Sequence, residues 1–392
     1  MLLDSPAGAD VTYRIQRSAG TDAVLFVLGG EMDRDHAAQL GELLALDPDR
    51  RVHLDLEDVT IVDRAAVTFL ARVESDRIRI VNCPEYVRSW ITAENATCEE
   101  ISMPDHLVTM TEDSFTTADG LKIVFRSWRP RSQPRAVVAI VPGFNSHSGY
   151  YTWAAGQLAG EGYAVSAIDL RGRGKSDGER FYVETFANYV ADVAAFVQLA
   201  KSRQPGLPIF LLGHSAGGVV SCLYALEHQT QLAGLICESF AFRLPAPDFA
   251  LAVLKGLSHV APHAHVLRLK NEDFSRDPQV VASMNADPLI AHETQPTKTL
   301  AEMVRADERL TQAFPLITLP LLILHGTADK ASQAAGSQFF YDTAGSKDKT
   351  LKLYEGHFHD LLNDLDKGKV MADITQWLGA MVSRTITSGS SS

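Results

Sequence analysis

The chain has 392 residues, of which 46% are hydrophobic and 21% charged, an ordinary balance for a globular protein of two or three domains. Its formal net charge is −12, and residues 1–105, with 10 Arg, no Lys and 20 Asp and Glu, carry −10 of that charge. This distribution excludes a nucleic-acid-binding protein, because such a protein needs a basic face.

Neither a membrane span nor a signal peptide is expected. No run of about 18 apolar residues occurs, and the N-terminus lacks a basic region followed by an apolar stretch. The four cysteines (Cys83, Cys98, Cys222 and Cys237) form no CxxC pair and no metal-ligand spacing, which indicates reduced thiols. We therefore expect a cytoplasmic protein.

Residues 11–91 alternate between predicted strands and short helices. The strands are "AVLFVLGGEMD", "RRVHLDLEDVTIVD" and "RIRIVNCP", and the helices between them are "RDHAAQLGELLAL" and "AAVTFLARVE". This order predicts a small α/β domain, with helices packed on a mixed sheet. No catalytic constellation is visible in it.

The segment resembles a STAS domain, the module of anti-sigma-factor antagonists, on the stretches "VLGGEMD", "VHLDLEDVTIVDRAAVTFLA" and "IRIVN". The resemblance implies a protein partner or self-association through this domain, and a plain α/β assembly domain remains an alternative. Many family members carry a phosphorylatable Ser or Thr after the aspartate. This chain has Asp63-Arg64-Ala65, so no phosphorylation switch is expected there. We assign residues 1–95 to the STAS-like domain and the polar residues 96–112 to a linker.

From residue 113 to 383 the pattern changes to near-continuous apolar strands separated by helices. The strands are "LKIVFRSWRP", "AVVAIVPGF", "YAVSAIDL", "PIFLLGHS", "LAGLICES" and "LPLLILHG". Strands of this kind predict a doubly wound, mostly parallel sheet that is covered by helices on both faces. The remaining residues, 384–392, end in "TSGSSS" and are expected to be a disordered tail.

Ser215 lies in a G-x-S-x-G motif between a predicted buried strand and a predicted helix. In α/β-hydrolases this arrangement is a nucleophile elbow, in which the serine adopts strained backbone angles at a sharp turn. The flanking Gly213 and Gly217 let such a turn close without Cβ clashes. Ser215 is therefore the candidate nucleophile.

A nucleophilic serine needs a histidine base and a carboxylate that orients the base. In α/β-hydrolases they follow in the order serine, acid, histidine. Asp329 stands in the loop after "LPLLILHG", where the acid belongs, and "LKLYEGHFHDLLND" then offers a strand and a loop with His357 and His359. The residues alone favour neither histidine.

Residues 113–383 also resemble the monoacylglycerol lipase and lysophospholipase branch of the α/β-hydrolases, the serine aminopeptidase S33-like group. The stretches that carry the resemblance are "HSGYY", "AIDLRGRGKSDGERFYV", "GHSAGG", "FSRDPQVV", "ADPL", "LILHGTADK" and "EGHFHDLLND". The closing motif of the family, laid on residues 356–360, selects His359 as the catalytic histidine. The resemblance implies a serine esterase of lipid-like substrates that uses Ser215, Asp329 and His359, with no metal or organic cofactor.

The oxyanion hole needs two backbone N–H groups aimed at the developing negative charge. Ala216, the residue after the nucleophile, should donate one of them. The resemblance implies that Phe144, in the loop "VPGFNSHSG", donates the other. Pro142 stands where the family usually has a histidine, and Phe144 would border the acyl side of the pocket.

Residues 240–315 do not read as sheet, and the resemblance implies a cap over the active site. Phe249, Val253 and Leu257 share one face of a predicted helix in this segment and are candidate substrate-binding residues. An apolar cap favours a lipid-like or aromatic ester.

Two further motifs suggest a phosphate-binding loop and a metal site, but neither motif is complete. Gly174-Lys175-Ser176 suggests a phosphate-binding loop, but Asp169 stands where that motif requires glycine. His259, His263 and His265 suggest a metal, but no carboxylate or cysteine completes a ligand set.

Two other functions stay open. The same triad would serve an amide, a thioester, a polyester or a small aromatic ester. Alternatively, the chain would be a STAS-type signalling scaffold whose hydrolase domain is subordinate.

Overall fold

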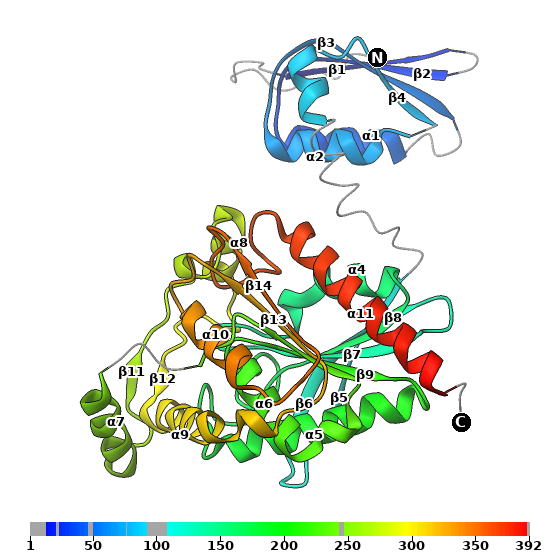
Figure 1. Cartoon of the computed structure of the whole chain (residues 1–392). Helices are drawn as coiled ribbons and strands as arrows, with labels where there is room; N and C mark the ends of the chain where they lie inside the picture. Colours follow the sequence, from blue (N-terminus) through cyan, green and yellow to red (C-terminus); the bar gives the residue numbers. More distant parts are fainter. Residues whose placement is uncertain are drawn as a thin grey trace. The chain divides into compact units, whose positions relative to one another are not determined.

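The computed structural model divides the chain into two compact units, Met1–Ser102 and Met103–Ser392 (Figure 1). The residues whose structure it describes are 13–20, 23–45, 50–75, 77–91, 108–242 and 247–389.

The first unit contains a four-stranded sheet in the order β1 (Tyr13–Ala19), β2 (Ala23–Met32), β3 (Arg51–Val62) and β4 (Ile78–Val81). The first pair is antiparallel and the other two pairs are parallel. Helices α1 (Arg34–Ala45) and α2 (Arg64–Val73) follow β2 and β3 in the chain. Strand β2 buries every second residue, including Val24, Phe26 and Leu28, which is the pattern of a strand with one face on a core. The assignment of this unit as STAS-like stays a prediction.

The second unit is built on an eight-stranded sheet in the order β14-β13-β10-β9-β7-β8-β6-β5. The bounds of its strands are β5 Val108–Thr116, β6 Lys122–Pro130, β7 Ala136–Val141, β8 Tyr163–Ile168, β9 Ile209–His214, β10 Gly234–Glu238, β13 Leu321–Gly326 and β14 Lys349–Tyr354. All neighbouring pairs from β14 to β8 are parallel, whereas β6 and β5 are antiparallel. The predicted mostly parallel sheet is confirmed.

Helices cover both faces of this sheet. Helices α4 (Thr152–Gly160) and α11 (Lys367–Gly389) pack on one face. Helices α5 (Phe186–Arg203), α6 (Ala216–His228) and α10 (Ala334–Thr343) pack on the other, as Figure 1 shows. The central strands β7, β9 and β13 are buried along their whole length, so their sequences are continuous apolar runs.

The segment between β10 and β13 is an insertion of helices and short strands, and its assignment as a cap over the active site stays a prediction. It comprises α7 (Asp248–Val260), β11 (His265–Leu267), α8 (Pro278–Ala286), β12 (Gln295–Pro296) and α9 (Thr297–Ala313). Helix α9 packs onto the core of the sheet through Met303, Ala306 and Leu310. The insertion is therefore anchored at its C-terminal end.

Two predicted boundaries are wrong. Strand β5 begins at Val108, inside the predicted linker 96–112, because it is an edge strand whose mostly exposed, polar residues give no apolar signal. Helix α11 continues to Gly389 through most of the predicted tail 384–392, since each residue added to an existing helix gains a backbone hydrogen bond. The rest of the predicted linker, 96–107, and of the tail, 390–392, lies outside the described residues.

Candidate active site

Ser215 occupies a sharp turn between β9 and α6. Its backbone angles, φ 55° and ψ −122°, are those of a strained residue, as expected at a nucleophile elbow. A Cβ on Gly217 would lie 2.1 Å from the carbonyl oxygen of Val141, and a Cβ on Gly213 would lie 2.5 Å from Ser221 Oγ. Only glycine fits these two positions, so the G-x-S-x-G pattern follows from the packing of the turn.

Asp329 and His359 come together from the loops after β13 and β14. Nδ1 of His359 lies 2.8 Å from Oδ2 of Asp329, and both side chains are 1% exposed. The ring of His359 lies 5.0 Å from that of His214, the residue before Ser215. The three predicted residues therefore follow the carboxyl ends of strands β9, β13 and β14 of the same sheet, the edge where ligands bind in open α/β sheets.

The histidine that the residues alone could not choose is distinguished by these contacts. His357 does not share the carboxylate of Asp329. Its Nδ1 lies 3.9 Å from Oδ2 of Asp364 instead. His359 therefore makes the contact with the carboxylate of Asp329 that is expected of a base oriented by an acid.

Asp329 has further partners that the sequence analysis missed. The backbone N–H groups of Ala331 and Ser332 donate to its Oδ1, and the hydroxyl of Ser332 donates to Oδ2. The buried His325, at the end of β13, places Nε2 3.0 Å from Oδ2. His325 could have been found from the sequence, because it is a histidine near the end of an otherwise apolar strand, four residues before the acid.

These contacts keep Asp329 ionised. Burial by itself would raise the pKa of this carboxyl, but the charge of His359 and the hydrogen bonds from His325 and His359 outweigh burial and hold the pKa well below its usual value. A carboxylate that stays charged stabilises the positive charge of a histidine that has accepted a proton.

The predicted oxyanion-hole residues lie on two segments that meet at Ser215. Ala216 is the first residue of α6 and is 1% exposed. On the other side, a Cβ on Gly143 would lie 2.7 Å from Ser215 Cβ, so the loop that carries Phe144 is packed directly against the turn. Phe144 is 4% exposed, and its ring lies under the guanidinium of Arg173.

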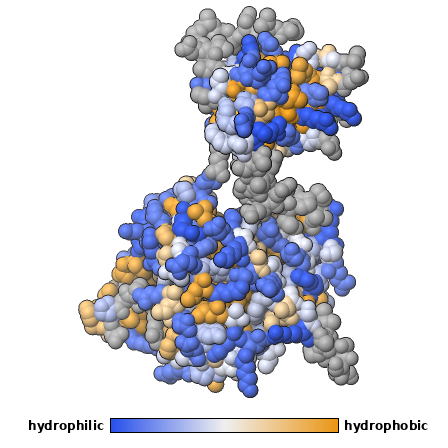
Figure 2. Space-filling model, turned by 45° about the horizontal axis from the view of Figure 1, so that its top comes forward, coloured by the Kyte–Doolittle hydropathy of each residue, from blue (hydrophilic) through white to orange (hydrophobic). Residues whose placement is uncertain are grey.

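The three candidate substrate-binding residues of α7 face solvent. Phe249 is 74% exposed, Val253 65% and Leu257 39%. Figure 2 shows apolar surface at the end of the second unit that carries this helix. The helical periodicity identified an apolar face correctly, but this face does not pack on the core.

One buried cluster has the residue types of a metal site. Ligand atoms of His214, Glu238 and Asp360 all lie within 4.8 Å of one another, and the three residues are at most 3% exposed. Burial, together with the charge of Asp360, raises the pKa of Glu238 well above its usual value. Burial also raises the pKa of Asp360 to about 6 and lowers that of His214 to about 3. All three shifts disfavour the charged forms of these side chains, as their burial requires.

Replacing Glu238 with glutamine is expected to stabilise the protein increasingly as the pH rises. In the unfolded chain Glu238 loses its proton near its ordinary pKa of 4.5, whereas in the folded protein it keeps the proton to higher pH. The folded state of the wild type therefore loses stability above pH 4.5, by up to about 1.4 kcal/mol per pH unit. Glutamine cannot ionise, so the stability advantage of Glu238→Gln should be larger at pH 8 than at pH 5 in denaturant titrations.

Glu161→Gln is the matched control, because it makes the same substitution at an exposed carboxyl. An advantage of Glu238→Gln that is the same at pH 5 and pH 8 would contradict a proton held by the folded protein.

The comparisons with known proteins concern the second unit. Residues 132–366 match the family model described as serine aminopeptidase, S33. The chain is 32% identical over 272 residues to the monoacylglycerol lipase of Mycolicibacterium smegmatis, covering 69% of this chain and 97% of that one. It is 35% identical over 280 residues to the monoglyceride lipase of Homo sapiens, covering 70% and 91%. The crystal structure of Paleococcus ferrophilus monoacylglycerol lipase matches with a TM-score of 0.59 and 27% identity, covering 70% of this chain and 99% of that one.

Together, the fold and these relatives define the class: the chain is a carboxylic ester hydrolase with the α/β-hydrolase fold. More particularly, it belongs to the monoglyceride lipase-like S33 family of α/β-hydrolases. Within the described ranges, no helix is both long and apolar enough to cross a membrane.

Proposed function

We propose that the protein hydrolyses carboxylic esters of a lipid-like acyl group, of the monoacylglycerol or lysophospholipid type, through Ser215, His359 and Asp329. The observation that carries the proposal is the contact between His359 and Asp329 beside the strained turn of Ser215. The resemblance to monoglyceride lipases supports the substrate class.

In the proposed acylation step, Oγ of Ser215 attacks the ester carbonyl while Nε2 of His359 takes the hydroxyl proton. Asp329 accepts a hydrogen bond from Nδ1 and stabilises the resulting imidazolium. The backbone N–H groups of Ala216 and Phe144 stabilise the oxyanion, and the start of α6 adds the positive end of its dipole. When the C–O bond breaks, the alcohol leaves with the proton from His359, and an acyl-serine remains.

Deacylation repeats these roles with water. His359 removes a proton from the water molecule as it attacks the acyl carbonyl, and the second oxyanion forms in the same hole. Collapse of this intermediate returns the proton to Ser215 Oγ and releases the carboxylic acid. Both halves of the cycle therefore depend on the same N–H donors.

The exposed apolar face of α7 favours a lipid-like substrate. Its three candidate residues expose large apolar side chains, and Figure 2 shows apolar surface on this part of the second unit. Exposed apolar surface of this kind marks a place where apolar molecules bind.

A panel of esters tests the substrate class. It runs from short p-nitrophenyl esters to long-chain monoacylglycerols and lysophospholipids, with matched amides and thioesters beside them. For a lipid-like substrate, kcat/KM should rise with acyl chain length, since each buried CH₂ contributes about 0.8 kcal/mol. Turnover that is confined to short or aromatic esters would contradict the lipid-like acyl group, and preferred cleavage of amides or thioesters would replace the ester.

A further inference from the structure

A buried arginine lies beside the predicted oxyanion loop. Arg173, in the loop after β8, is 1% exposed, and its guanidinium carbon lies 3.8 Å from the centre of the Phe144 ring. The guanidinium also donates to the side chain of Gln295, at 2.9 Å. Arg173 thus holds the ring of the residue whose N–H is the proposed second oxyanion donor.

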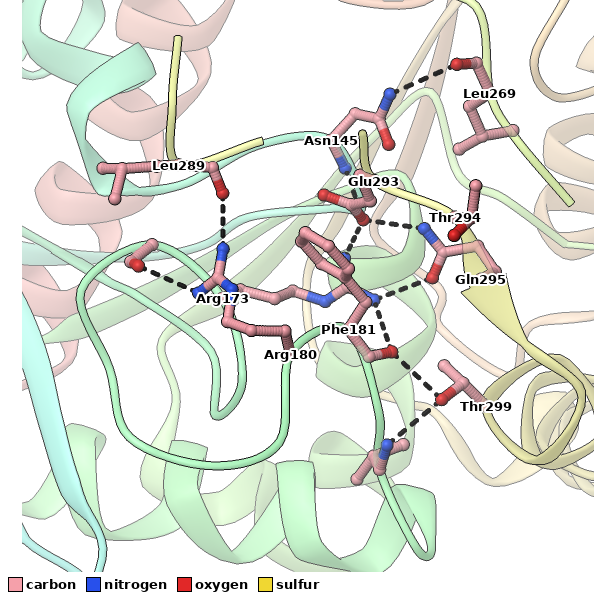
Figure 3. Close-up of polar contacts among 12 residues, drawn as sticks. Asn145, Arg173, Arg180, Phe181, Leu269, Leu289, Glu293, Thr294, Gln295 and Thr299 are labelled. Atoms are coloured by element: carbon pink, nitrogen blue, oxygen red, sulfur yellow. Dashed lines mark hydrogen bonds and ion pairs between the residues drawn. The ribbon is translucent and has the colours of Figure 1, made fainter. Parts of the chain in front are cut away.

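The counter-charge of Arg173 comes from the cap insertion. Glu293, 3% exposed, forms an ion pair with Arg173 through Oε1. The same oxygen accepts the backbone N–H of Asn145 at 3.1 Å and the side-chain amide of Gln295 at 2.7 Å, as Figure 3 shows. One carboxylate oxygen therefore joins the loop after β7, the loop after β8 and the cap.

The hydrogen bond to Asn145 acts on the geometry of Phe144. The peptide unit is planar, so holding the N–H of Asn145 fixes the orientation of the whole Phe144–Asn145 peptide. Asn145 itself has φ 50°, in the left-handed region that a residue other than glycine adopts only when its surroundings hold it there. Phe144 is thus held on both sides, its ring by Arg173 and the peptide that follows it by Glu293.

We propose that Glu293 is a positioning residue of the oxyanion hole, with Arg173 as the counter-charge that permits its burial. Glu293 touches no reacting atom, and it acts by fixing the peptide after Phe144 so that the N–H of Phe144 points at the oxyanion. Because Glu293 belongs to the cap, docking of the cap completes the hole. This inference rests on the proposed function, since it assigns a role to the hole beside Ser215.

A pair of double variants isolates the hydrogen bond. A single substitution would leave one buried charge unpaired and risk unfolding the protein, so Arg173→Met is combined with either Glu293→Gln or Glu293→Leu. Both double variants lack the two charges and the contact of Arg173 with Phe144. Only the glutamine keeps an oxygen that accepts the N–H of Asn145, so the difference between the two variants measures this acceptor.

The leucine variant should have a kcat at least about ten-fold below that of the glutamine variant, with equal KM, since small misplacements of catalytic groups cost up to about 10²-fold. It should also bind a trifluoromethyl ketone, whose adduct with the serine mimics the oxyanion, at least about ten-fold more weakly. Affinity for a non-cleavable ether analogue of the substrate should be the same. If Glu293 had only a structural role, the leucine variant would lose affinity for both inhibitors to the same extent.

Arg180→Met is the control for general loosening of the cap. Arg180 joins the loop after β8 to the cap by donating to the carbonyl oxygens of Gly174 and Leu289, and its described hydrogen bonds do not include residues 143–145. This variant should keep the wild-type kcat. A loss in Arg180→Met as large as that in the leucine variant would overturn the specific role of Glu293, and so would equal kcat values in the two double variants.

Hydrogen exchange of the full-length wild type supplies a measurement that needs no activity. The amide of Asn145 should exchange slowly, and it should exchange faster in the leucine variant than in the glutamine variant. Rapid exchange of this amide in the wild type would overturn the inference even if neither double variant folds. If the wild type cleaves no ester, the proposed function fails, whereas the exchange result still decides whether Glu293 holds the loop.

Discussion

Replacing Ser215 with alanine should lower kcat by about 10⁵–10⁶-fold with little change in KM, because the covalent route is lost while the substrate pocket is kept. The alanine adds no atom to the crowded turn, so the fold should be preserved. Residual activity above the uncatalysed rate should come from the oxyanion donors, which remain in place. The measurement is steady-state hydrolysis of the best ester of the panel, together with labelling of the protein by a fluorophosphonate.

Ser221→Ala is the matched control for this variant. Ser221 lies on α6, six residues after Ser215, and it is buried as well. Its Oγ has no hydrogen-bond partner among the residues that the structure describes, so its removal breaks no hydrogen bond there. Ser221→Ala should retain both activity and labelling. Ester hydrolysis that survives in Ser215→Ala would refute Ser215 as the nucleophile.

The architecture of the second unit and the place of its candidate nucleophile could be predicted from the sequence because both leave local signals. Strands that are buried on both faces are mostly apolar, and β7, β9 and β13 are continuous apolar runs up to the histidines near the ends of β9 and β13. The elbow is visible in the sequence because its two positions must be glycine. A Cβ atom at either position would lie only about 2–3 Å from backbone atoms. The edge strand β5 has only one neighbour and an exposed face, so it had no such signal.

The choice between His357 and His359 could not be made from the local sequence. Both histidines follow the same strand, and nothing in their spacing tells which ring reaches the acid. The contact of His359 with Asp329 joins residues 30 positions apart. Family resemblance, rather than residue chemistry, selected the histidine that makes this contact.

The contacts that hold the site together span still longer separations. Arg173 and Glu293 are 120 residues apart, and Asn145 and Glu293 are 148 apart. Each of these side chains is unremarkable within its own segment. Their roles depend on the docking of the cap insertion against two loops of the sheet, which no local pattern records. For the same reason, the apolar face of α7 was visible in the sequence, but its exposure was not.

Replacing Asp329 with asparagine should lower kcat by about 10⁴-fold, the size expected when the acid of a Ser-His-Asp triad loses its charge. Asparagine has nearly the same shape, but its amide nitrogen cannot accept a hydrogen bond from Nδ1 of His359. It also offers no negative charge to the imidazolium. Because the pKa of Asp329 is held well below its usual value, the wild type should show no loss of activity from protonation of this carboxyl between pH 5 and 9.

Asp360→Asn distinguishes this role from a general need for buried negative charge near the base. Asp360 follows His359 in the chain, is 3% exposed and has a pKa of about 6 because of its burial. Its two oxygens accept from the side-chain amide of Asn363, and no hydrogen bond to the ring of His359 is present among the described contacts. Asp360→Asn should therefore keep kcat within about ten-fold of the wild type, the cost of one altered hydrogen bond. If Asp360→Asn were the inactive variant and Asp329→Asn the active one, Asp360 would be the acid, and the contact between Asp329 and His359 would have no part in catalysis.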